Sequence, residues 1–428
     1  PNWDKNFSAP DFIALIKKGN KKGGPLSLYF HIPFCEERCT FCACSVVATK
    51  KHAVTTPYLK SLFREIEIMG ELVDRRRPVE QIHWGGGTPT YLTCEQIEQL
   101  YKKITTHFHI SPTAEISIEV DPRVTSKEQI QTLRALGFNR MSLGVQDFEP
   151  AVQKEAGRVQ SEEETKAVID CGRALHFDSI NIDLVYGLPK QTESTFHRTV
   201  QKVIALNPNR VALFHFAHVP WMHAHQRKMS EKDLPTSMEK MRMFCNAIEQ
   251  FREAGYEFIG LDHFAKQDDE LTKARREGTM YRNFQGYTTK ADCELIGMGV
   301  TSISTLDGCL AQNAKKLKEY EEGIQKGLTT QTGKILSEDD IIRNWVICEI
   351  FCHQNINKEK FKKAFNKNFD SYFKSEIARL KPLEEDGFLT QDPRAVSVTP
   401  LGRLFLRNIG MIFDAYLQTG AGKFSKTA

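Results

Sequence analysis

Short apolar, β-branched segments alternate with amphipathic helical segments through the first half of this chain, and the alternation limits the folds that it can adopt. The six expected strands span residues 27–32, 81–84, 116–120, 140–145, 179–186 and 210–216. The expected helices between them span residues 57–72, 95–107, 127–136, 162–175 and 195–205. Strands that alternate with helices form βαβ units and a parallel sheet. Six units predict an α/β fold with a full or partial βα barrel, whose ligand-binding groups lie at the carboxyl ends of the strands.

The alternation ends after Phe216, and helices dominate from about Ser337. Between these points we expect a helix over 237–254, a strand over 257–261 and a glycine-punctuated region over 283–303. The C-terminal pattern predicts helices over 338–351, 358–365 and 371–383, two short strands over 388–390 and 396–399, and a helix from Leu401. This order resembles a winged-helix layout. We therefore expect an N-terminal segment (1–26), a barrel with an extension (27–330) and a mostly helical, winged-helix-like C-terminal domain (331–428).

Charge and hydropathy argue against two classes of partner. The chain carries 58 Lys and Arg against 54 Asp and Glu, a net charge of +4. Residues 331–428 carry 15 basic and 12 acidic residues, which is not the concentrated basic face that binding to DNA phosphates requires. No apolar run approaches the length of about 18 residues that a membrane span needs. We therefore expect no nucleic-acid and no membrane partner, and we interpret the C-terminal domain as a lid or packing domain.

The cysteine distribution indicates a reducing compartment. Eleven cysteines is an odd number, and four of them fall within ten residues. A secreted disulfide framework has an even number of cysteines in a short chain. The first residues also lack the apolar core of a secretory signal. We expect a cytoplasmic protein, and because the chain begins at Pro1 rather than Met, we expect its natural N-terminus to lie upstream.

Three cysteines with the spacing Cys-x3-Cys-x2-Cys, namely Cys35, Cys39 and Cys42, follow the first expected strand. A loop with this spacing can bring three thiolates to one iron–sulfur cluster and leave one iron open to bind a small molecule, whereas four thiolates would close the cluster. Structural zinc takes a second pair of ligands, and no such pair is evident. Cys44 is only two residues from Cys42, so it lies either beside the cluster or in the packing around it.

Glycines and a carboxylate stand at the ends of the next two strands. Gly85, Gly86 and Gly87 follow the second strand, and glycines allow positive φ angles and a close approach of the backbone to a ligand. A tight βα turn would use the same residues, so that alternative stays open. Glu119 interrupts an otherwise apolar strand. A buried carboxylate needs hydrogen-bond donors, which either a ribose diol or an internal ion pair can supply.

Three further polar residues, Gln146, Arg158 and Asp183, lie at or just after the fourth and fifth expected strands. Arg158 and Asp183 either pair with each other or hold a charged ligand. Both interpretations place them at the mouth of the barrel.

Two other clusters are interpreted as structural. Cys348 and Cys352 have helical spacing within an apolar pattern, which favours core packing over metal binding. Four histidines, His215, His218, His223 and His225, lack acidic companions at ligand spacing, so we expect no second metal site there.

The cysteine spacing resembles that of the radical S-adenosylmethionine (SAM) enzymes, and longer stretches resemble one family among them. These stretches are residues 28–35, 83–92, 114–122, 144–148, 181–191, 262–265, 282–289, 297–300 and 402–409. They cover essentially the whole chain and resemble the oxygen-independent coproporphyrinogen III oxidases (dehydrogenases). The later stretches are more specific than the cysteine spacing.

This resemblance implies a fold and an activity. The fold is a partial (βα)6 radical SAM barrel with a mostly helical C-terminal domain. The activity is that of an oxidoreductase in porphyrin and haem biosynthesis, which converts the propionates of rings A and B of coproporphyrinogen III to vinyl groups and yields protoporphyrinogen IX without oxygen. An electron donor such as flavodoxin or ferredoxin is implied, and we expect a monomer. The family usually carries an N-terminal arm that helps to cover the active site, and we expect that arm to be missing here.

The same resemblance implies a [4Fe–4S] cluster on Cys35, Cys39 and Cys42, and two SAM molecules in each active site. The positions that match the first SAM site are Tyr29, Gly86, Glu119 and Ile303. Those that match the second are Phe41, Gly87, Thr88, Gln146, Arg158, Asp183 and Ala217, with Phe284 and Gln285 near it. In such enzymes, reductive cleavage of SAM gives a 5′-deoxyadenosyl radical that removes a hydrogen from the propionate β-carbon, after which carbon dioxide and one electron leave.

Two other relatives with this barrel are alternatives: a haem chaperone and a radical methyltransferase that opens haem. The chaperones typically have an aromatic residue where Cys44 stands and lack the stretch 282–289. Both features of this sequence favour the oxidase.

Overall fold

The computed structural model describes residues 3–4, 6–328 and 330–417, and the chain forms two compact units. The first, which we call the barrel unit, consists mainly of Trp3–Tyr256 and Asp292–Lys334. The second, the C-terminal unit, consists mainly of Glu257–Ala291 and the described residues from Ile335 onward. Residues 257–291, which sequence analysis groups with the barrel, therefore cluster with the C-terminal helices.

The barrel unit is built on parallel strands that pair in chain order, as the alternation predicts. They are β1 (Leu26–Ile32), β4 (Pro78–Gly86), β5 (His109–Val120), β6 (Arg140–Gln146), β7 (Ser179–Tyr186) and β8 (Arg210–His215). Beyond β1 the sheet continues through β13 (Glu294–Met298), which is parallel to it, and then through β14 (Ile303–Leu306), β15 (Cys309–Asn313) and β16 (Thr330–Ile335). The predicted α/β fold is confirmed. Within the described residues the sheet stays open, so the partial barrel that the resemblance implies is also confirmed.

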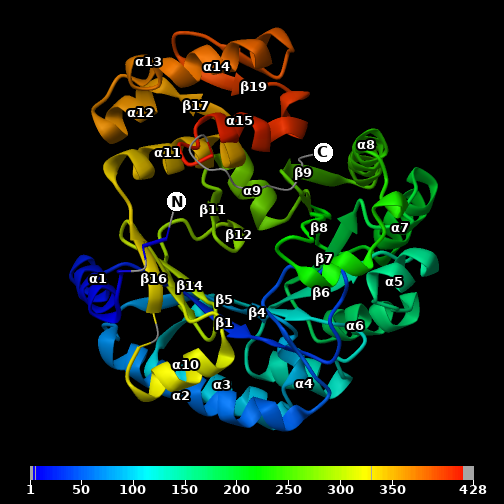
Figure 1. Cartoon of the computed structure of the whole chain (residues 1–428), viewed down its shortest axis with the longest axis vertical. Coiled ribbons are helices and arrows are strands. Elements are labelled where there is room, and N and C mark those ends of the chain that lie inside the picture. The colour runs from blue at the N-terminus through cyan, green and yellow to red at the C-terminus, as the bar shows by residue number, and fades with distance from the viewer. Residues whose placement is uncertain (1–2, 5, 329, 418–428) are drawn as a thin grey trace. The chain divides into compact units, whose positions relative to one another are not determined.

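Five of the helices that connect successive parallel strands lie on the outside of the sheet (Figure 1). They are α2 (Thr55–Leu72), α3 (Cys94–His107), α4 (Lys127–Ala135), α6 (Glu162–Ala174) and α7 (Glu193–Leu206). Four of these begin with a capping box, in which the side chain of Thr93, Ser126, Ser161 or Thr192 accepts from a backbone N–H three residues on. Each such cap contributes about 1 kcal/mol to helix stability. The caps fix where each helix starts, and so also the length of the loop that leaves the preceding strand.

Alternate residues of these strands face opposite sides of the sheet, as the two-residue period of a strand requires. One side carries apolar residues such as Phe30 and Trp84, which are fully buried and whose rings meet edge to face. The other side carries polar residues that hydrogen bond from strand to strand. Gln81 accepts from Ser27 at 2.8 Å and donates to Glu115 at 2.9 Å. The polar side is the one that leads to the functional site.

A buried carboxylate holds the end of β13. Glu65 on α2 accepts hydrogen bonds from the Gly299 N–H at 2.7 Å, the Asn313 amide at 2.6 Å and the Tyr320 hydroxyl at 2.6 Å. Gly299 has a φ of +99°, and a Cβ there would lie 2.5 Å from the Tyr58 hydroxyl. Only glycine fits this turn, because every other side chain would collide with the network.

The C-terminal unit is mostly helical, as expected. Its helical elements include α11 (Glu338–Cys348), η5 (Glu349–His353), α12 (Lys358–Phe365), α13 (Phe369–Tyr372), α14 (Lys374–Glu385), η6 (Gly402–Phe405) and α15 (Leu406–Ile412). The two predicted strands become β18 (Leu389–Gln391) and β19 (Ala395–Val398). A third strand, β17 (Asn355–Asn357), pairs with β19 and was not predicted, because a single apolar residue, Ile356, between two asparagines is too short a pattern to indicate a strand.

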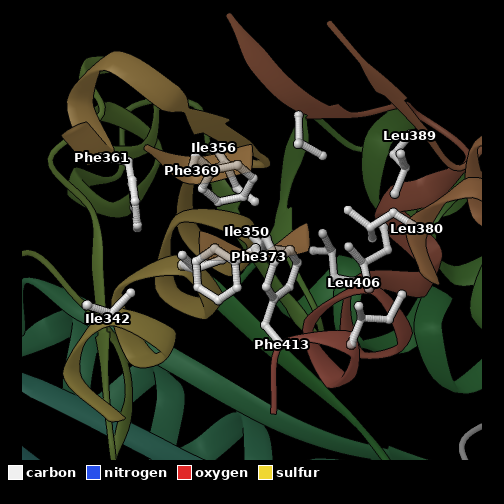
Figure 2. Close-up of a cluster of buried hydrophobic side chains, with 14 of the residues drawn as sticks. Ile342, Ile350, Ile356, Phe361, Phe369, Phe373, Leu380, Leu389, Leu406 and Phe413 are labelled. Carbon is white, nitrogen blue, oxygen red and sulfur yellow. The ribbon is translucent and has the colours of Figure 1, made fainter. Parts of the chain in front are cut away.

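An aromatic core stabilises this unit (Figure 2). Phe361, Phe369, Phe373 and Phe413 are each at most 1% exposed and contact one another through their rings. Cys352 is also buried, packed with apolar residues of 257–291, which agrees with the packing role predicted for it. Among the described residues, no helix has both the length and the apolar character that crossing a membrane requires.

Candidate active site

A cavity of about 350 Å³ opens at the carboxyl ends of the parallel strands in the barrel unit. Eleven of the residues predicted from the sequence line it: Cys35, Cys39, Phe41, Cys42, Gly86, Gly87, Thr88, Glu119, Gln146, Arg158 and Asp183. They come from β4, β5, β6 and β7 and from the loops that follow β1, β4 and β6, at the edge of the sheet where a parallel α/β fold places its ligand-binding groups. Cys44 lines the same cavity.

The cysteine loop is held from both sides. Its Thr40 N–H donates to the Ala156 carbonyl at 2.9 Å. On the other side, His225 Nε2 lies 2.7 Å from the Cys42 carbonyl, and the Gln226 amide donates to the Phe41 carbonyl at 3.2 Å. These contacts fix the backbone that carries the three cysteines before any cofactor binds.

The thiols have different proton affinities. Burial raises the pKa of Cys35 to about 11, although Thr88 Oγ1 lies 3.4 Å from its sulfur. A hydrogen bond from the Cys44 thiol lowers the pKa of Cys42 to about 7 and outweighs the effect of burial. Thiolates rather than thiols bind metal, so the contact with Cys44 favours the metal-binding form of Cys42. Within the described residues, no three His, Cys, Asp or Glu side chains stand at the spacing of a single-ion site.

The glycine run brings two backbone segments together. The N–H groups of Gly87 and Thr88 donate to the carbonyls of Ile32 and Phe34, each at 2.8 Å. A Cβ at Gly87 would lie 2.6 Å from the Phe34 carbonyl oxygen. The run therefore packs directly against the start of the cysteine loop and presents bare backbone to the cavity.

Glu119 points into the cavity from β5. One carboxylate oxygen accepts from the Gly86 N–H at 3.0 Å, and the other lies 3.3 Å from His83 Nε2. Burial alone would raise the pKa of Glu119, but the hydrogen bond and charge of His83 outweigh it and hold the pKa below its ordinary value. The side chain is 43% exposed, so it is more open to the cavity than the apolar strand suggested.

Arg158 pairs with a carboxylate other than the one considered from the sequence. Its guanidinium lies 2.9 Å from Asp121, and both side chains are 9% exposed. It also donates to the Gly144 carbonyl at 2.6 Å and lies 3.9 Å from the Cys39 sulfur. Asp183 accepts instead from Ser142 at 3.2 Å and from Asn181 at 2.7 Å. Arg158 thus connects the β6 loop to the cysteine loop.

The other predicted residues lie outside the cavity lining. The Tyr29 hydroxyl lies 2.9 Å from His31 Nδ1, and Ile303 is buried at the start of β14. The Ala217 carbonyl accepts from Gln226 at 3.2 Å. Phe284 and Gln285 form the turn between β11 (Tyr281–Asn283) and β12 (Gly286–Thr288) in the C-terminal unit, where Phe284 is 65% exposed.

Sequence reasoning missed several residues of the site. Asp121, Arg123, Ser142 and Phe214 also line the cavity, and His83 contacts Glu119 beside it. A signal was available for His83, because strand alternation places it on the same face as Gln81. Asp121 directly follows the strand that contains Glu119, and its pairing with Arg158 spans 37 residues, which no local pattern reveals.

The comparisons with known proteins agree with this geometry. Residues 29–203 match the model of the radical SAM superfamily, and residues 336–405 match that of the HemN C-terminal domain. The chain is 46% identical to the oxygen-independent coproporphyrinogen III oxidase of Synechocystis sp., over 97% of this chain and 90% of that protein. It is 45% identical to the Escherichia coli enzyme of the same name, over 98% and 91% of the two chains. The chain belongs to the oxygen-independent coproporphyrinogen III oxidase family.

A solved structure supports this membership. The coproporphyrinogen III oxidase of Escherichia coli, described as a radical SAM enzyme, matches with a TM-score of 0.94 at 42% identity, over 97% of this chain and 95% of that one. As a member of the oxygen-independent coproporphyrinogen III oxidase family, the chain is a radical SAM enzyme with a [4Fe–4S] cluster and SAM as cofactors. The cavity fits these groups, because three cysteine side chains, bare glycine backbone and a carboxylate with unused acceptor capacity face one space.

Proposed function

We propose that this protein catalyses the oxygen-independent oxidative decarboxylation of two propionates of coproporphyrinogen III, which gives protoporphyrinogen IX. Similarity to enzymes of that name over 97% of the chain carries the proposal. The cysteine-lined cavity at the barrel mouth supplies an independent structural argument. Each propionate loses one hydrogen atom, one electron and carbon dioxide, and a vinyl group remains.

In this proposal, Cys35, Cys39 and Cys42 hold the cluster. When bound, the cluster and SAM supply the one-electron chemistry that removes a hydrogen from an unactivated carbon. The protein contributes position and environment. The contacts of Thr40, His225 and Gln226 hold the cysteine loop in place, so the cluster is bound to a fixed backbone.

We assign the residues around SAM as follows. Glu119 accepts hydrogen bonds from the ribose hydroxyls of the first SAM. Gly86 and His83 occupy two of its roughly four acceptor positions, so about two remain for the ribose. Gly86 offers its backbone to the methionyl group. Tyr29 and Ile303 complete that site. The proposed second site is formed by Phe41, Gly87, Thr88, Gln146, Arg158, Asp183 and Ala217, with Phe284 and Gln285.

Partners and surroundings follow from the same proposal. Loss of one electron per propionate and reduction of the cluster both require external redox partners, and we infer a donor such as flavodoxin or ferredoxin. The near balance of 58 basic and 54 acidic residues supports a protein without a nucleic-acid partner. We further propose that it acts as a monomer in the cytoplasm.

The deciding experiment is anaerobic incubation of the reconstituted protein with coproporphyrinogen III, SAM and a reductant, followed by porphyrin analysis. We expect protoporphyrinogen IX, with two SAM consumed per product molecule. Binding of labelled SAM at equilibrium should approach two per protein. Haem transfer without any decarboxylation would contradict the proposal and identify a haem chaperone.

A further inference from the structure

His83 lies on the polar side of β4 and contacts three neighbours. Its Nδ1 is 2.7 Å from the Ser117 hydroxyl, and its Nε2 is 3.3 Å from Glu119. Its ring stacks on Tyr29 with a centroid distance of 5.9 Å and an interplanar angle of 15°. The stack and the Ser117 contact restrict rotation of the imidazole, so Nε2 stays directed at the carboxylate.

Proton counting shows which atom donates. The Ser117 hydroxyl has one proton, and it faces both His83 Nδ1 and the Ile82 carbonyl, the latter at 3.2 Å. If that proton goes to Nδ1, His83 is neutral and carries its own proton on Nε2. If it goes to Ile82, Nδ1 must donate to Ser117, and a bond to Glu119 then requires a doubly protonated ring. In both arrangements a hydrogen bond to an ionised Glu119 requires Nε2 to be the donor.

The carboxylate is held in a fixed orientation by its other contacts. Its second oxygen accepts from Gly86 N–H at 3.0 Å. A Cβ at Gly85 would lie 2.9 Å from the carboxylate, so the group rests on bare backbone. With one donor on each oxygen, the remaining acceptor positions face the cavity that Glu119 lines.

We propose that His83 is a positioning residue for SAM binding, which acts by orienting Glu119 toward the ribose of the first SAM. This inference rests on the proposed function of Glu119. His83 would act through Glu119, since His83 itself does not line the cavity. The alternative is that His83 only fills the polar side of the sheet, as Gln81 does two residues earlier on the same strand.

Equilibrium binding of SAM to the reconstituted protein tests this without turnover. His83→Phe keeps an aromatic ring beside Tyr29 but removes the donor, and we expect its Kd for SAM to rise about tenfold to a hundredfold. His83→Gln can still donate from its amide and should stay within about threefold of the parent protein. Iron content should be unchanged in both. In the assay, the KM for SAM should rise in His83→Phe, while kcat at saturating SAM changes much less.

Two controls separate positioning from a structural effect. Gln81→Met breaks hydrogen bonds on the same face of the same strand, so it should lower the melting temperature and leave the Kd for SAM unchanged. Glu119→Gln should raise the Kd, and addition of His83→Phe to it should raise the Kd no further, because residues that act as one unit are not additive.

A Kd unchanged in His83→Phe would overturn the proposal, as would additive effects in the double variant. These outcomes are distinct from failure of the proposed function. If the parent protein binds SAM but forms no protoporphyrinogen IX, the assigned reaction fails while the His83 result still stands.

Discussion

At the scale of single residues, the site depends on which carboxylate lies beside which cation. Asp121 lies between Arg158 at 2.9 Å and Arg123 at 2.7 Å. Burial alone would raise the pKa of Asp121, but the two guanidinium groups outweigh it and hold the pKa below its ordinary range. Arg158 therefore has a structural partner and also lines the cavity. The two roles can be separated by measurement.

Arg158→Ala should lower the free energy of unfolding by about 1–3 kcal/mol, the usual cost of one lost hydrogen bond to a buried charged group. This loss of stability should be smaller than that caused by a buried charge with no remaining partner, because Asp121 still forms its ion pair with Arg123. Addition of Asp121→Asn to Arg158→Ala should recover part of the lost free energy of unfolding. Denaturant unfolding of the single and the double variant measures the loss and the recovery. Because Arg158 also belongs to the proposed second SAM site, the SAM stoichiometry of Arg158→Ala should fall as well. A large loss of stability with unchanged stoichiometry would contradict binding.

The cluster ligands make a second residue-scale prediction. Cys35→Ser, Cys39→Ser and Cys42→Ser should each lose the four-iron cluster and all turnover, since each removes one of the three thiolates. Cys348→Ser, in the C-terminal unit, should keep both and serves as the matched control. Cys44→Ser should retain iron. Iron and sulfide analysis with visible absorption checks this. Full iron content in Cys39→Ser would refute the ligand set.

At the scale of elements, polar networks set the positions of strand ends and helices. Glu65 joins α2 to Gly299 at the end of β13, to Asn313 at the end of β15 and to Tyr320 on α10 (Leu317–Gln325). Burial raises the pKa of Glu65, and the three donors oppose this only in part. Ionisation of this carboxylate is therefore less favourable in the folded protein than in the unfolded chain.

The raised pKa gives a pH prediction with a definite sign. A carboxyl whose pKa is higher in the folded state contributes stability below its unfolded pKa of about 4.3, and this contribution is lost as the pH rises through the folded value. Glu65→Gln removes that dependence. The stability of the parent protein relative to Glu65→Gln should therefore fall between pH 4, just below the unfolded pKa of about 4.3, and pH 8. Urea unfolding of both proteins at the two pH values measures the difference, and a parent protein that gains relative stability with pH would contradict the argument.

The aromatic core of the C-terminal unit gives a prediction of packing. Phe373 is fully buried, with ring centroids 5.1 Å from Phe369 and 5.2 Å from Phe413. Phe373→Ala should cost about 3–5 kcal/mol, since the cavity left behind cannot collapse completely. Leu401→Ala is the control: its side chain is 48% exposed, so we expect a change within about 0.5 kcal/mol. Chemical denaturation of the two variants checks this, and equal losses would be inconsistent with the core described here.

At the scale of the whole molecule, the two units are interleaved along the chain. The path leaves the barrel unit near Tyr256, returns at Asp292 and leaves again after Lys334. Leu261 packs with α11 to α15, and Ile259, Ala265 and Met280 pack with Cys352. The helical part from Ile335 onward is therefore not an independent domain, because residues 257–291 contribute to its hydrophobic core.

Truncation after Lys334 should expose that shared core. We expect the shortened chain to bind a hydrophobic dye and to aggregate, since the apolar residues of 257–291 lose the partners that bury them. Dye fluorescence and size-exclusion chromatography, with the full chain measured in parallel, test this. A monomeric truncated protein with an unchanged melting temperature would show that 257–291 folds independently of the C-terminal helices.

The amino-acid sequence by itself determined the order of strands and helices, the cysteine loop and about half of the cavity lining. Hydrophobic periodicity, capping residues and glycines act over a few residues, so 27–32 and 127–136 are close to the observed β1 and α4. Tertiary structure decided what depends on contacts between distant residues. The ion-pair partner of Arg158 is Asp121 rather than Asp183. His83 on β4 contacts Glu119 on the neighbouring strand β5. The open sheet and the grouping of 257–291 with the C-terminal helices are also tertiary outcomes. The physical reason is that pairing partners are chosen by proximity in the folded chain, which spacing along the sequence does not specify.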